Sequence, residues 1–503
     1  MLILAGFQSP VHAAPSRPEI DVILWFDTED YLSLADDDAV LRLCQMLTER
    51  GIHATFKLVG EKARVLEQRH RQDVITALKR HDIGYHANLH SVHPTPTEYL
   101  AEAGWLDGIA EFARREGGGA ADVRRILGVD TLACYGQPGS SWAPQAIAAL
   151  KDIGVAPHGV PCYVDDGRHV GLDHKPCWYD NALLVYEMGP NVTRMDLHDP
   201  VALEPAKQKV SGIAQRLSSE GGGLISIYYH PCEWIHQEFW DAVNFKRGAN
   251  PPREQWKAPP QRTAAETDAA FTQFAQYLDH IRAVPGVRFI TASDLPLLYP
   301  DPVRTAGASA IDLVEIANHI SREKSTLDSI TLGTRSYSVA DQFELLTKAV
   351  NETGAGHKLG FPLKASGLFG PDARPPAGAT ITNLNWFALR DAVREVSQFM
   401  AKEHRVPSRV FIGSEPMAPA DFLIALASAW NYYLAHGAPP TQELIDLGKH
   451  TRLLPENHVA EDTPGLFGGW IIHEENFRAP KVMEQARLQA WTLKPAIRAD
   501  RKE

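Results

Sequence analysis

The chain has 503 residues, of which 44% are hydrophobic and 22% charged, and its formal net charge is -12. This length predicts two to four domains, and the composition is that of a globular protein. The acidic balance argues against nucleic acid as a partner and favours neutral or cationic substrates. No apolar run is long enough to span a bilayer, so we expect no transmembrane segment.

The N-terminus resembles an incomplete export signal. A short apolar run at residues 2–7 is followed by a small-residue stretch at 11–15 that is typical of a cleavage site, but the basic region of a signal peptide is missing. We therefore expect residues 1–18 to be a signal peptide or a disordered tail. A signal would make the protein secreted or periplasmic, whereas a chain without one would be cytoplasmic.

Five cysteines form no CxxC pair, which argues against a zinc–thiolate site. Cys162 and Cys177 flank a loop-like segment and can form a disulfide if the protein is exported. We expect the other three to be buried thiols.

Strand and helix patterns alternate between about residues 20 and 300. Apolar runs predict strands at residues 20–26, 51–59, 82–86, 133–135, 184–188, 224–229 and 287–291. Amphipathic patterns predict helices at residues 38–50, 65–80, 97–116, 144–153 and 263–284. Such alternation predicts a parallel sheet or a βα barrel, in which the chemistry lies at the C-terminal ends of the strands.

Beyond a linker at 300–310 the composition becomes mainly helical. Similar helix starts at 339–346 and 418–424 indicate a faint internal repeat, and 385–404 is strongly amphipathic. The apolar stretch 465–472 is predicted to be an extended segment docked on the domain. The predicted organisation is a signal peptide or tail at 1–18, a barrel at 19–299, the linker at 300–310 and a mainly helical accessory domain at 311–503.

A cluster of carboxylates ends the first predicted strand. If the strand continues, Asp27 and Glu29 lie on one face, because side chains alternate with a period of two. One carboxylate can then bind a metal while the other remains free as a base. Asp30 leaves the choice of ligand open, and an acidic turn that caps the strand is the alternative interpretation.

A pair of histidines closes the third predicted strand. His86 ends it and His90 follows four residues later, a spacing that would place both rings on one side of a helical turn. Two imidazoles and a carboxylate suit zinc, cobalt or iron. Because His81 and His93 lie close by, structural or exposed histidines are the alternative.

The apolar strand 224–229 delivers His230 to its end, where it could protonate a leaving group. Its alternative is a core histidine beside a turn proline.

Together these pieces resemble the polysaccharide deacetylases of carbohydrate esterase family 4, which include the nodulation-type chitooligosaccharide deacetylases. The resemblance covers roughly residues 20–298. The segments that carry it are 26–30 (the acidic first motif), 54–60 (strand two), 81–90 (the histidine motif), 230–233 (a His-Pro-x-Glu form of the last motif) and 289–295 (the closing segment).

The resemblance implies a distorted (β/α) barrel that uses a divalent metal, zinc before cobalt or iron, to remove N-acetyl groups from a glycan. It makes Asp27 the general base and His230 the general acid. Glu29, His86 and His90 become the metal ligands.

The third motif departs from the family. The segment 135–142 lacks the arginine that usually orients the base. Gln137 can hydrogen-bond a carboxylate but supplies no charge, and Trp142 is either a wall of the sugar site or a buried aromatic. We predict both as substrate-binding residues. His93 is placed behind the ligands, and Asp165 and Asp166 are candidate loop residues of the site.

Two other functions remain open. Relatives of this fold hydrolyse cyclic amides or imides, as allantoinases do, and their acidic motifs look alike. A degenerate barrel that only binds glycan, with the C-terminal domain associated with the cell wall, is the other alternative.

Overall fold

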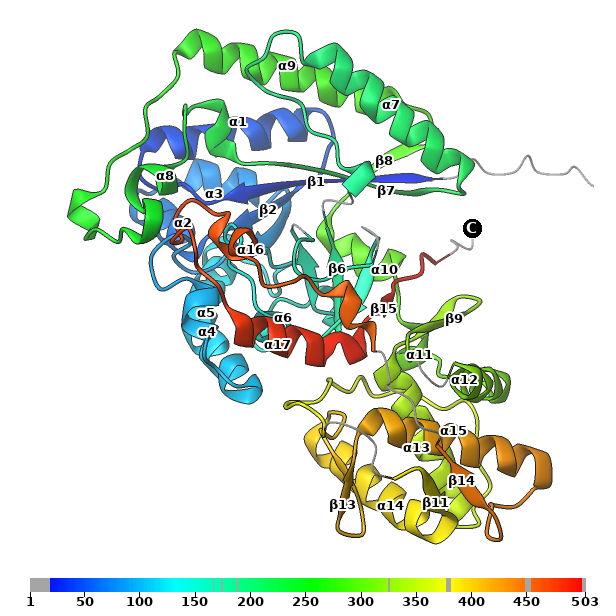
Figure 1. Cartoon of the computed structure of the whole chain (residues 1–503). Helices are drawn as coiled ribbons and strands as arrows, with labels where there is room; N and C mark the ends of the chain where they lie inside the picture. Colours follow the sequence, from blue (N-terminus) through cyan, green and yellow to red (C-terminus); the bar gives the residue numbers. More distant parts are fainter. Residues whose placement is uncertain are drawn as a thin grey trace, which may run out of the picture.

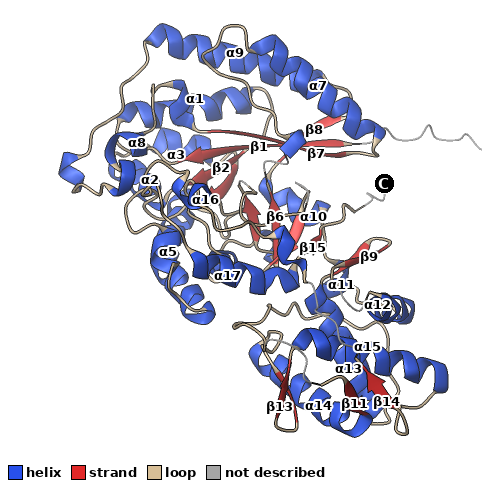
Figure 2. Ribbon diagram, viewed as in Figure 1, coloured by secondary structure: helices blue, strands red, loops and turns tan. Residues whose placement is uncertain are grey.

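The computed structural model of the chain contains a larger body built around a sheet and a smaller, mainly helical body (Figure 1). Figure 2 shows strands at the centre of the larger body with helices around them. The structure describes residues 19–165, 167–172, 175–186, 189–323, 326–376, 381–447 and 454–499. The predicted N-terminal signal or tail, residues 1–18, lies outside the described residues.

The strands are β1 (Ile20–Thr28), β2 (Thr55–Leu58), β3 (Asp82–Tyr85), β4 (Cys162–Val164), β5 (Cys177–Tyr179), β6 (Ala182–Val185), β7 (Gly223–Tyr229), β8 (Val287–Ile290), β9 (Ile330–Leu332), β10 (Arg335–Tyr337), β11 (Asn383–Asn385), β12 (Val410–Ile412), β13 (Glu415–Met417), β14 (Leu444–Asp446) and β15 (Lys494–Pro495).

The helices of the larger body are α1 (Leu34–Glu49), α2 (Gly60–Gln68), α3 (Gln72–Leu78), α4 (Pro96–Leu100), α5 (Trp105–Leu127), α6 (Pro144–Ala149), α7 (Leu203–Ser219), α8 (Trp240–Asn244), α9 (Ala264–Ala283), α10 (Leu295–Leu298), α16 (Pro464–Gly468) and α17 (Pro480–Gln489). Those of the smaller body are α11 (Pro302–Thr305), α12 (Ala310–Arg322), α13 (Val339–Gly354), α14 (Trp386–Glu403) and α15 (Pro419–His436).

The strands of the larger body form a curved wall. Parallel pairing runs β3–β2–β1–β7, with β8 beside the beginning of β1. Beyond β3 the wall continues through Tyr135, which bridges in parallel to Tyr85 and Tyr163, and then through β4, β6, β5 and β15. Among the described residues no pairing joins β15 back to β7. The predicted α/β fold of the distorted barrel type is confirmed, with this side of the wall open.

The first strand shows why the sheet forms here. All nine residues of β1 are buried, as in a parallel strand with both faces covered. Helices α7 and α9 lie side by side, with α7 against β7 and α9 against β8 (Figure 1). Two predicted helices are broken: 65–80 divides into α2 and α3 at His70, whose φ is +55°, and 97–116 divides into α4 and α5.

The smaller body is built from two copies of one unit, eighty residues apart. In each copy a helix precedes a β-hairpin and a second helix follows it: α12, β9–β10 and α13, then α14, β12–β13 and α15. Gly333 and Gly413 open the two-residue hairpin turns with φ near +63° and +62°, a conformation that glycine adopts without strain. The two halves share one apolar core around Phe343 and Phe422.

The chain returns to the larger body after the smaller one. Phe467, Val482 and Leu493 belong to the core of the barrel, and α17 lies beside α6 (Figure 1). The predicted domain boundaries stay a prediction, but the two hydrophobic cores place the C-terminal residues 459–496 largely with the barrel, apart from Trp491 in the core of the smaller body.

All five cysteines are free and buried. Cys162 and Cys177 lie on β4 and β5, on opposite sides of β6, so their backbones are about two strand spacings, roughly 10 Å, apart. This arrangement contradicts the predicted pairing, since a disulfide requires Cα atoms within about 7 Å. In the described part of the chain, none of the helices combines the length and apolar character needed to cross a bilayer.

Candidate active site

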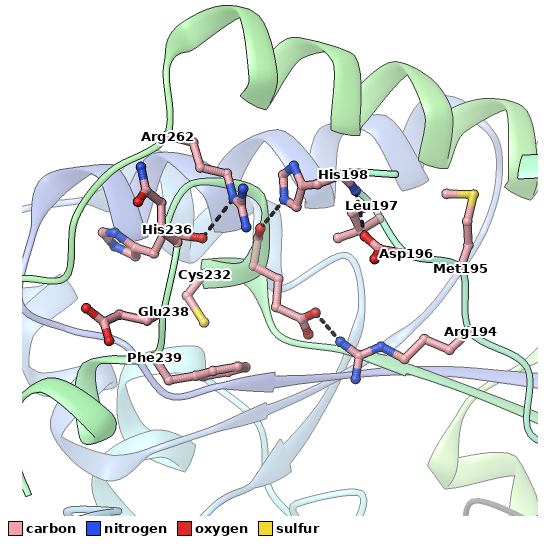
Figure 3. Close-up of a pocket in the computed structure, with 12 residues that line it drawn as sticks. Arg194, Met195, Asp196, Leu197, His198, Cys232, His236, Glu238, Phe239 and Arg262 are labelled. Atoms are coloured by element: carbon pink, nitrogen blue, oxygen red, sulfur yellow. Dashed lines mark hydrogen bonds and ion pairs between the residues drawn. The ribbon is translucent and has the colours of Figure 1, made fainter. Parts of the chain in front are cut away.

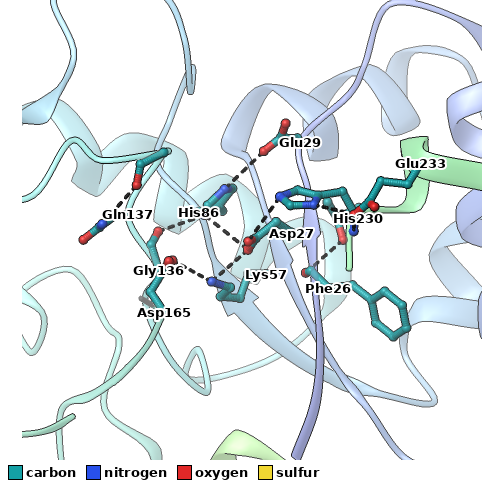
Figure 4. A network of polar contacts seen from close by, with 12 residues as sticks. Phe26, Asp27, Glu29, Lys57, His86, Gly136, Gln137, Asp165, His230 and Glu233 are labelled. Carbon is teal, nitrogen blue, oxygen red and sulfur yellow. Dashed lines mark hydrogen bonds and ion pairs between the residues drawn. The ribbon is translucent and has the colours of Figure 1, made fainter. Parts of the chain in front are cut away.

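Three parallel strands deliver polar side chains to one cavity of about 610 Å³. Asp27 and Glu29 come from the end of β1, His86 and His90 from the loop after β3, and His230 from the end of β7. Figure 4 shows most of these groups converging. The five residues predicted to carry the chemistry therefore line one cavity, at the edge of the sheet where α/β folds place their sites.

Glu29 lies between the two histidines. Its Oε2 is 2.8 Å from His90 Nε2 and 3.4 Å from His86 Nε2, and all three side chains are buried. The three donor atoms lie within 4.8 Å of one another, close enough to share one ion. His86 Nδ1 lies 2.9 Å from the Gly136 carbonyl, a contact that favours the tautomer with the Nε2 lone pair turned to Glu29.

The expected helical turn between the histidines is wrong. Residues 86–90 form an irregular loop, and the backbone at Ala87 and His90 has φ of +66° and +58°. The loop nevertheless brings the two ring centroids to 4.9 Å. Left-handed backbone at a residue other than glycine costs free energy and concentrates at functional sites, so this loop is shaped for the position of the rings.

The electrostatics of this cluster suit a divalent cation. Burial alone would raise the pKa of Glu29, but His90 and His86 outweigh it and lower that pKa well below its ordinary value. Burial also lowers the pKa of His86, which keeps the ring neutral, as a ligand must be. Two buried imidazoles and one ionised carboxylate are a ligand set for zinc, cobalt or iron. The residues therefore fit the metal that the sequence predicts.

Asp27 pairs with a lysine that sequence reasoning missed. Lys57, on β2, is fully buried, and its Nζ is 2.8 Å from both Asp27 Oδ1 and Asp165 Oδ2. It also donates to the Val164 carbonyl at 2.8 Å and stands 4.1 Å from the centre of the Trp25 ring. Burial alone would raise the pKa of Asp27, but the neighbouring side chains His86, Lys57 and His230 lower it.

Asp27, His86 and Asp165 form a second cluster of potential ligands. Lys57 already supplies a positive charge between Asp27 and Asp165, so the Glu29 cluster is the better candidate for binding a cation. The signal for Lys57 was present in the sequence: it is a lone cation inside the apolar strand Thr55–Leu58, and a buried lysine is almost always paired.

His230 is held by Glu233, three residues further on. Its Nδ1 is 2.8 Å from Glu233 Oε1, and its Nε2 faces Asp27 Oδ2 at 3.6 Å. Burial alone would lower the pKa of His230, but the Glu233 hydrogen bond and the nearby carboxylates outweigh it and raise the pKa to about 9. Glu233 is in turn paired with Arg194. His230 is therefore protonated at neutral pH with Nε2 turned to the cavity.

The two predicted substrate-binding residues lie in different surroundings. Gln137 lines the cavity, where its amide accepts from the Tyr163 hydroxyl at 2.6 Å and donates to the Gly139 carbonyl at 3.0 Å. Trp142 is buried and stacks on His169 with ring centroids 4.9 Å apart. Trp142 is not among the residues that line the cavity, so the structure places it as a buried aromatic and not as a wall of the cavity.

The other candidate site residues, Asp30, His93 and Asp166, have different environments. Asp30 is buried beside Cys232, and burial, followed by Asp36 and Glu29, raises its pKa well above the ordinary value, which favours the neutral acid. His93 Nδ1 lies 2.8 Å from the Glu98 carboxylate, behind the ligand pair. Asp166 lies outside the described residues.

A second cavity of about 440 Å³ adjoins the first (Figure 3). Arg194, Glu238 and Phe239 line both cavities, and the Phe239 ring stands edge-on to His230 with centroids 4.9 Å apart. The two cavities therefore share three lining side chains next to His230.

No protein-family model matches the chain, and no curated protein matches it. Several solved structures are similar. PuuE allantoinase is 12% identical, with 57% of this chain and 93% of that chain covered and a TM-score of 0.36. A Mycobacterium smegmatis protein assigned as a polysaccharide deacetylase is 14% identical, with 56% and 91% covered and a TM-score of 0.35. The 4-alpha-glucanotransferase of Thermococcus litoralis is 10% identical, with 61% and 46% covered and a TM-score of 0.37.

Polysaccharide deacetylases, which the sequence motifs resemble, are thus among the structures to which this chain is similar. Identities of 10% to 14% and TM-scores of 0.35 to 0.37 are too low to transfer an activity. The evidence for function is the geometry of the strand ends.

Proposed function

We propose that this protein is a metal-dependent deacetylase that removes acetyl groups from an N-acetylated glycan. One observation carries the proposal: a carboxylate with two imidazoles, a second ionised carboxylate and a protonated imidazole face one cavity. These are the groups that amide hydrolysis requires, namely a metal site, a base and an acid.

Glu29, His86 and His90 would hold the metal, and zinc suits this donor set best. A bound divalent cation would lower the pKa of a water molecule and polarise the acetyl oxygen. The Gly136 carbonyl fixes the orientation of the His86 ring, as outer partners do at metal sites.

Asp27 is the proposed base. Lys57 holds its Oδ1, so the carboxylate keeps one orientation with Oδ2 turned to His230 across the cavity. A water that attacks the acetyl carbon can pass a proton to this oxygen. The lysine ammonium supplies the positive charge that the third motif lacks, and supplies it from β2.

His230 is the proposed acid. With Nδ1 held by Glu233, the proton on Nε2 is available to the leaving nitrogen. When the carbon–nitrogen bond breaks, that proton goes to the nitrogen, and the products are acetate and a free amino sugar. Export from the cell belongs to the same proposal and depends on the character of residues 1–18.

The test joins metal content to product analysis. Purified protein should contain about one zinc per chain and release acetate from N-acetylated chitooligosaccharides. The variants His86→Ala and His90→Ala should lose the metal and at least about a thousandfold of the activity, because truncated ligands leave an incomplete site. His357→Ala, which removes an exposed histidine of the smaller body, is the control.

Unchanged acetate release by both ligand variants would overturn the proposal. Ring opening of a cyclic amide such as allantoin, without acetate release from any acetylated sugar, would instead favour the allantoinase-like alternative.

A further inference from the structure

A segment from the far end of the chain forms part of the active-site cavity. Gly469, Trp470 and Ile471 line the cavity next to Glu29 and His90, although more than 370 residues separate them in sequence. The apolar stretch at 465–472 is predicted to be an extended segment docked on the domain; the segment is docked, but its first residues belong to the short helix α16. None of the groups proposed to act in hydrolysis comes from it.

The segment is fixed on both sides of Trp470. Before it, the Ser140 hydroxyl donates to the Phe467 carbonyl at 2.6 Å. After it, Gly248 N donates to the Ile472 carbonyl at 2.7 Å, and His473 Nε2 lies 3.0 Å from the Thr95 hydroxyl. Phe467 and Ile472 are fully buried, whereas Ile471 is 41% exposed. The backbone is therefore anchored where it enters and leaves, and the residues between are presented to the cavity.

The indole of Trp470 is held in one orientation. Its Nε1 donates to Asp241 Oδ2 at 2.8 Å, and its ring stands edge-on to His90 with centroids 5.4 Å apart. Gly139 lies so close that a Cβ there would fall 2.1 Å from the ring, so only glycine fits beneath it. The indole is only partly buried, and its uncovered part lies beside a proposed metal ligand.

Such a surface is suited to a sugar ring. The C–H bonds of a pyranose form an apolar face, and a rigid indole offers a large apolar area at little entropic cost. Its position next to His90 places it where the sugar that bears the acetamide must lie. We propose that Trp470 is a specificity-determining residue that packs against this sugar ring, which makes the C-terminal segment part of the active site. This inference rests on the deacetylase function proposed above.

The test compares Trp470→Ala and Trp470→Phe with wild type in the full-length metal-loaded protein. The substrate is tri-N-acetylchitotriose, because a second cavity shares Arg194, Glu238 and Phe239 with the first and an oligomer offers further sugar rings to it. A second probe, acetohydroxamate, binds a metal but carries no ring. Trp470→Ala should raise KM for the trimer about tenfold with kcat changed less than about threefold, while the Ki of acetohydroxamate stays within about twofold.

Trp470→Phe should restore most of the affinity, because it keeps an aromatic face while losing the bond to Asp241. Phe411→Ala, which removes an aromatic side chain 49% exposed on the smaller body, should change nothing. An unchanged KM for Trp470→Ala would overturn the inference. So would a parallel rise of KM and of the acetohydroxamate Ki without rescue by phenylalanine, because that pattern belongs to a damaged metal site. If wild type releases no acetate, the proposed function itself fails, a result distinct from both.

Discussion

Two buried lysines in this molecule each form ion pairs with two aspartates, but the aspartates differ in their other contacts. Lys57 lies between Asp27 and Asp165 in the barrel, and Lys494 lies between Asp301 and Asp341 where the C-terminal segment meets the smaller body. All four ion-pair distances are 2.8 Å, and both ammonium groups are inaccessible to solvent.

The difference lies in what the aspartates do besides pairing. Asp341 accepts from the backbone of Ser338 at the start of α13, and Asp301 caps α11, so both complete helix ends. Asp27 instead faces two histidines at the rim of a cavity. A buried charge pair alone therefore does not mark a site. A pair indicates a functional site when its carboxylate also contacts titratable groups from other strands, as Asp27 does.

Removal of each lysine should separate the two cases most strongly. Lys57→Met and Lys494→Met should each lower the free energy of unfolding by about 3–5 kcal/mol, because each leaves two carboxylates buried without their cation. Only Lys57→Met should also lower kcat/KM, by about a hundredfold or more, since Asp27 loses its orientation and charge. Urea unfolding and acetate release measure the two effects. Retained activity in Lys57→Met would remove the distinction.

Exchange of a carboxylate for its amide should sharpen the comparison. Asp27→Asn should reduce kcat by about a thousandfold, because the base is lost, with little change in stability since Lys57 keeps Asp165 and the Val164 carbonyl. Asp341→Asn should leave kcat unchanged and lower the thermal midpoint, because Asp341 both pairs with Lys494 and completes the capping box of α13. Equal losses of activity in both variants would contradict the assigned base.

The barrel should lose stability in acid through His81. His81 accepts from the Ala54 N–H and contacts the Cys44 carbonyl through its other nitrogen, and burial lowers its pKa to about 4. Because the unfolded chain takes up this proton near pH 6.5, stability present above that value is lost as the pH falls towards 4, by about 3 kcal/mol. His81→Gln should flatten this part of the pH dependence of the barrel's thermal midpoint. An equal slope in both proteins would show that other groups control it.

The smallest expected effect concerns the acid. His230 must be protonated to act, so activity is present below its pKa and is lost as the pH rises through it. Glu233→Gln removes the carboxylate that raises this pKa and should move the basic limb of kcat/KM to lower pH by about one unit. A limb that does not move would assign the acid elsewhere.

Much of the barrel and its site follows from the sequence because the signals are local. Buried parallel strands are largely apolar runs, as are β1, which carries Asp27, and β7, which leads to His230. The strand before His86 is shorter and only partly apolar. Parallel strands place their carboxyl ends together, so residues at three such ends could be expected to meet.

What could not be predicted depends on distant partners. Nothing local to Lys57 indicates that Asp165 lies 108 residues away at bonding distance. Trp470 is held at the cavity by contacts with Asp241 and Gly139, and the spacing of residues in the sequence does not predict these contacts. The repeat was visible only in its helix starts, because each hairpin strand has three residues, too few to show an alternation.

The return of the chain to the barrel bears on the order of assembly during synthesis. The contact between Trp470 and Asp241 spans 229 residues, and that between His473 and Thr95 spans 378. Contacts this distant in sequence form late, because a long loop must close first. On the ribosome the strands that carry the proposed ligands emerge early, and the smaller body follows before residues 464–473 appear. A nascent barrel would therefore hold its proposed metal ligands well before the C-terminal segment completes the cavity beside them.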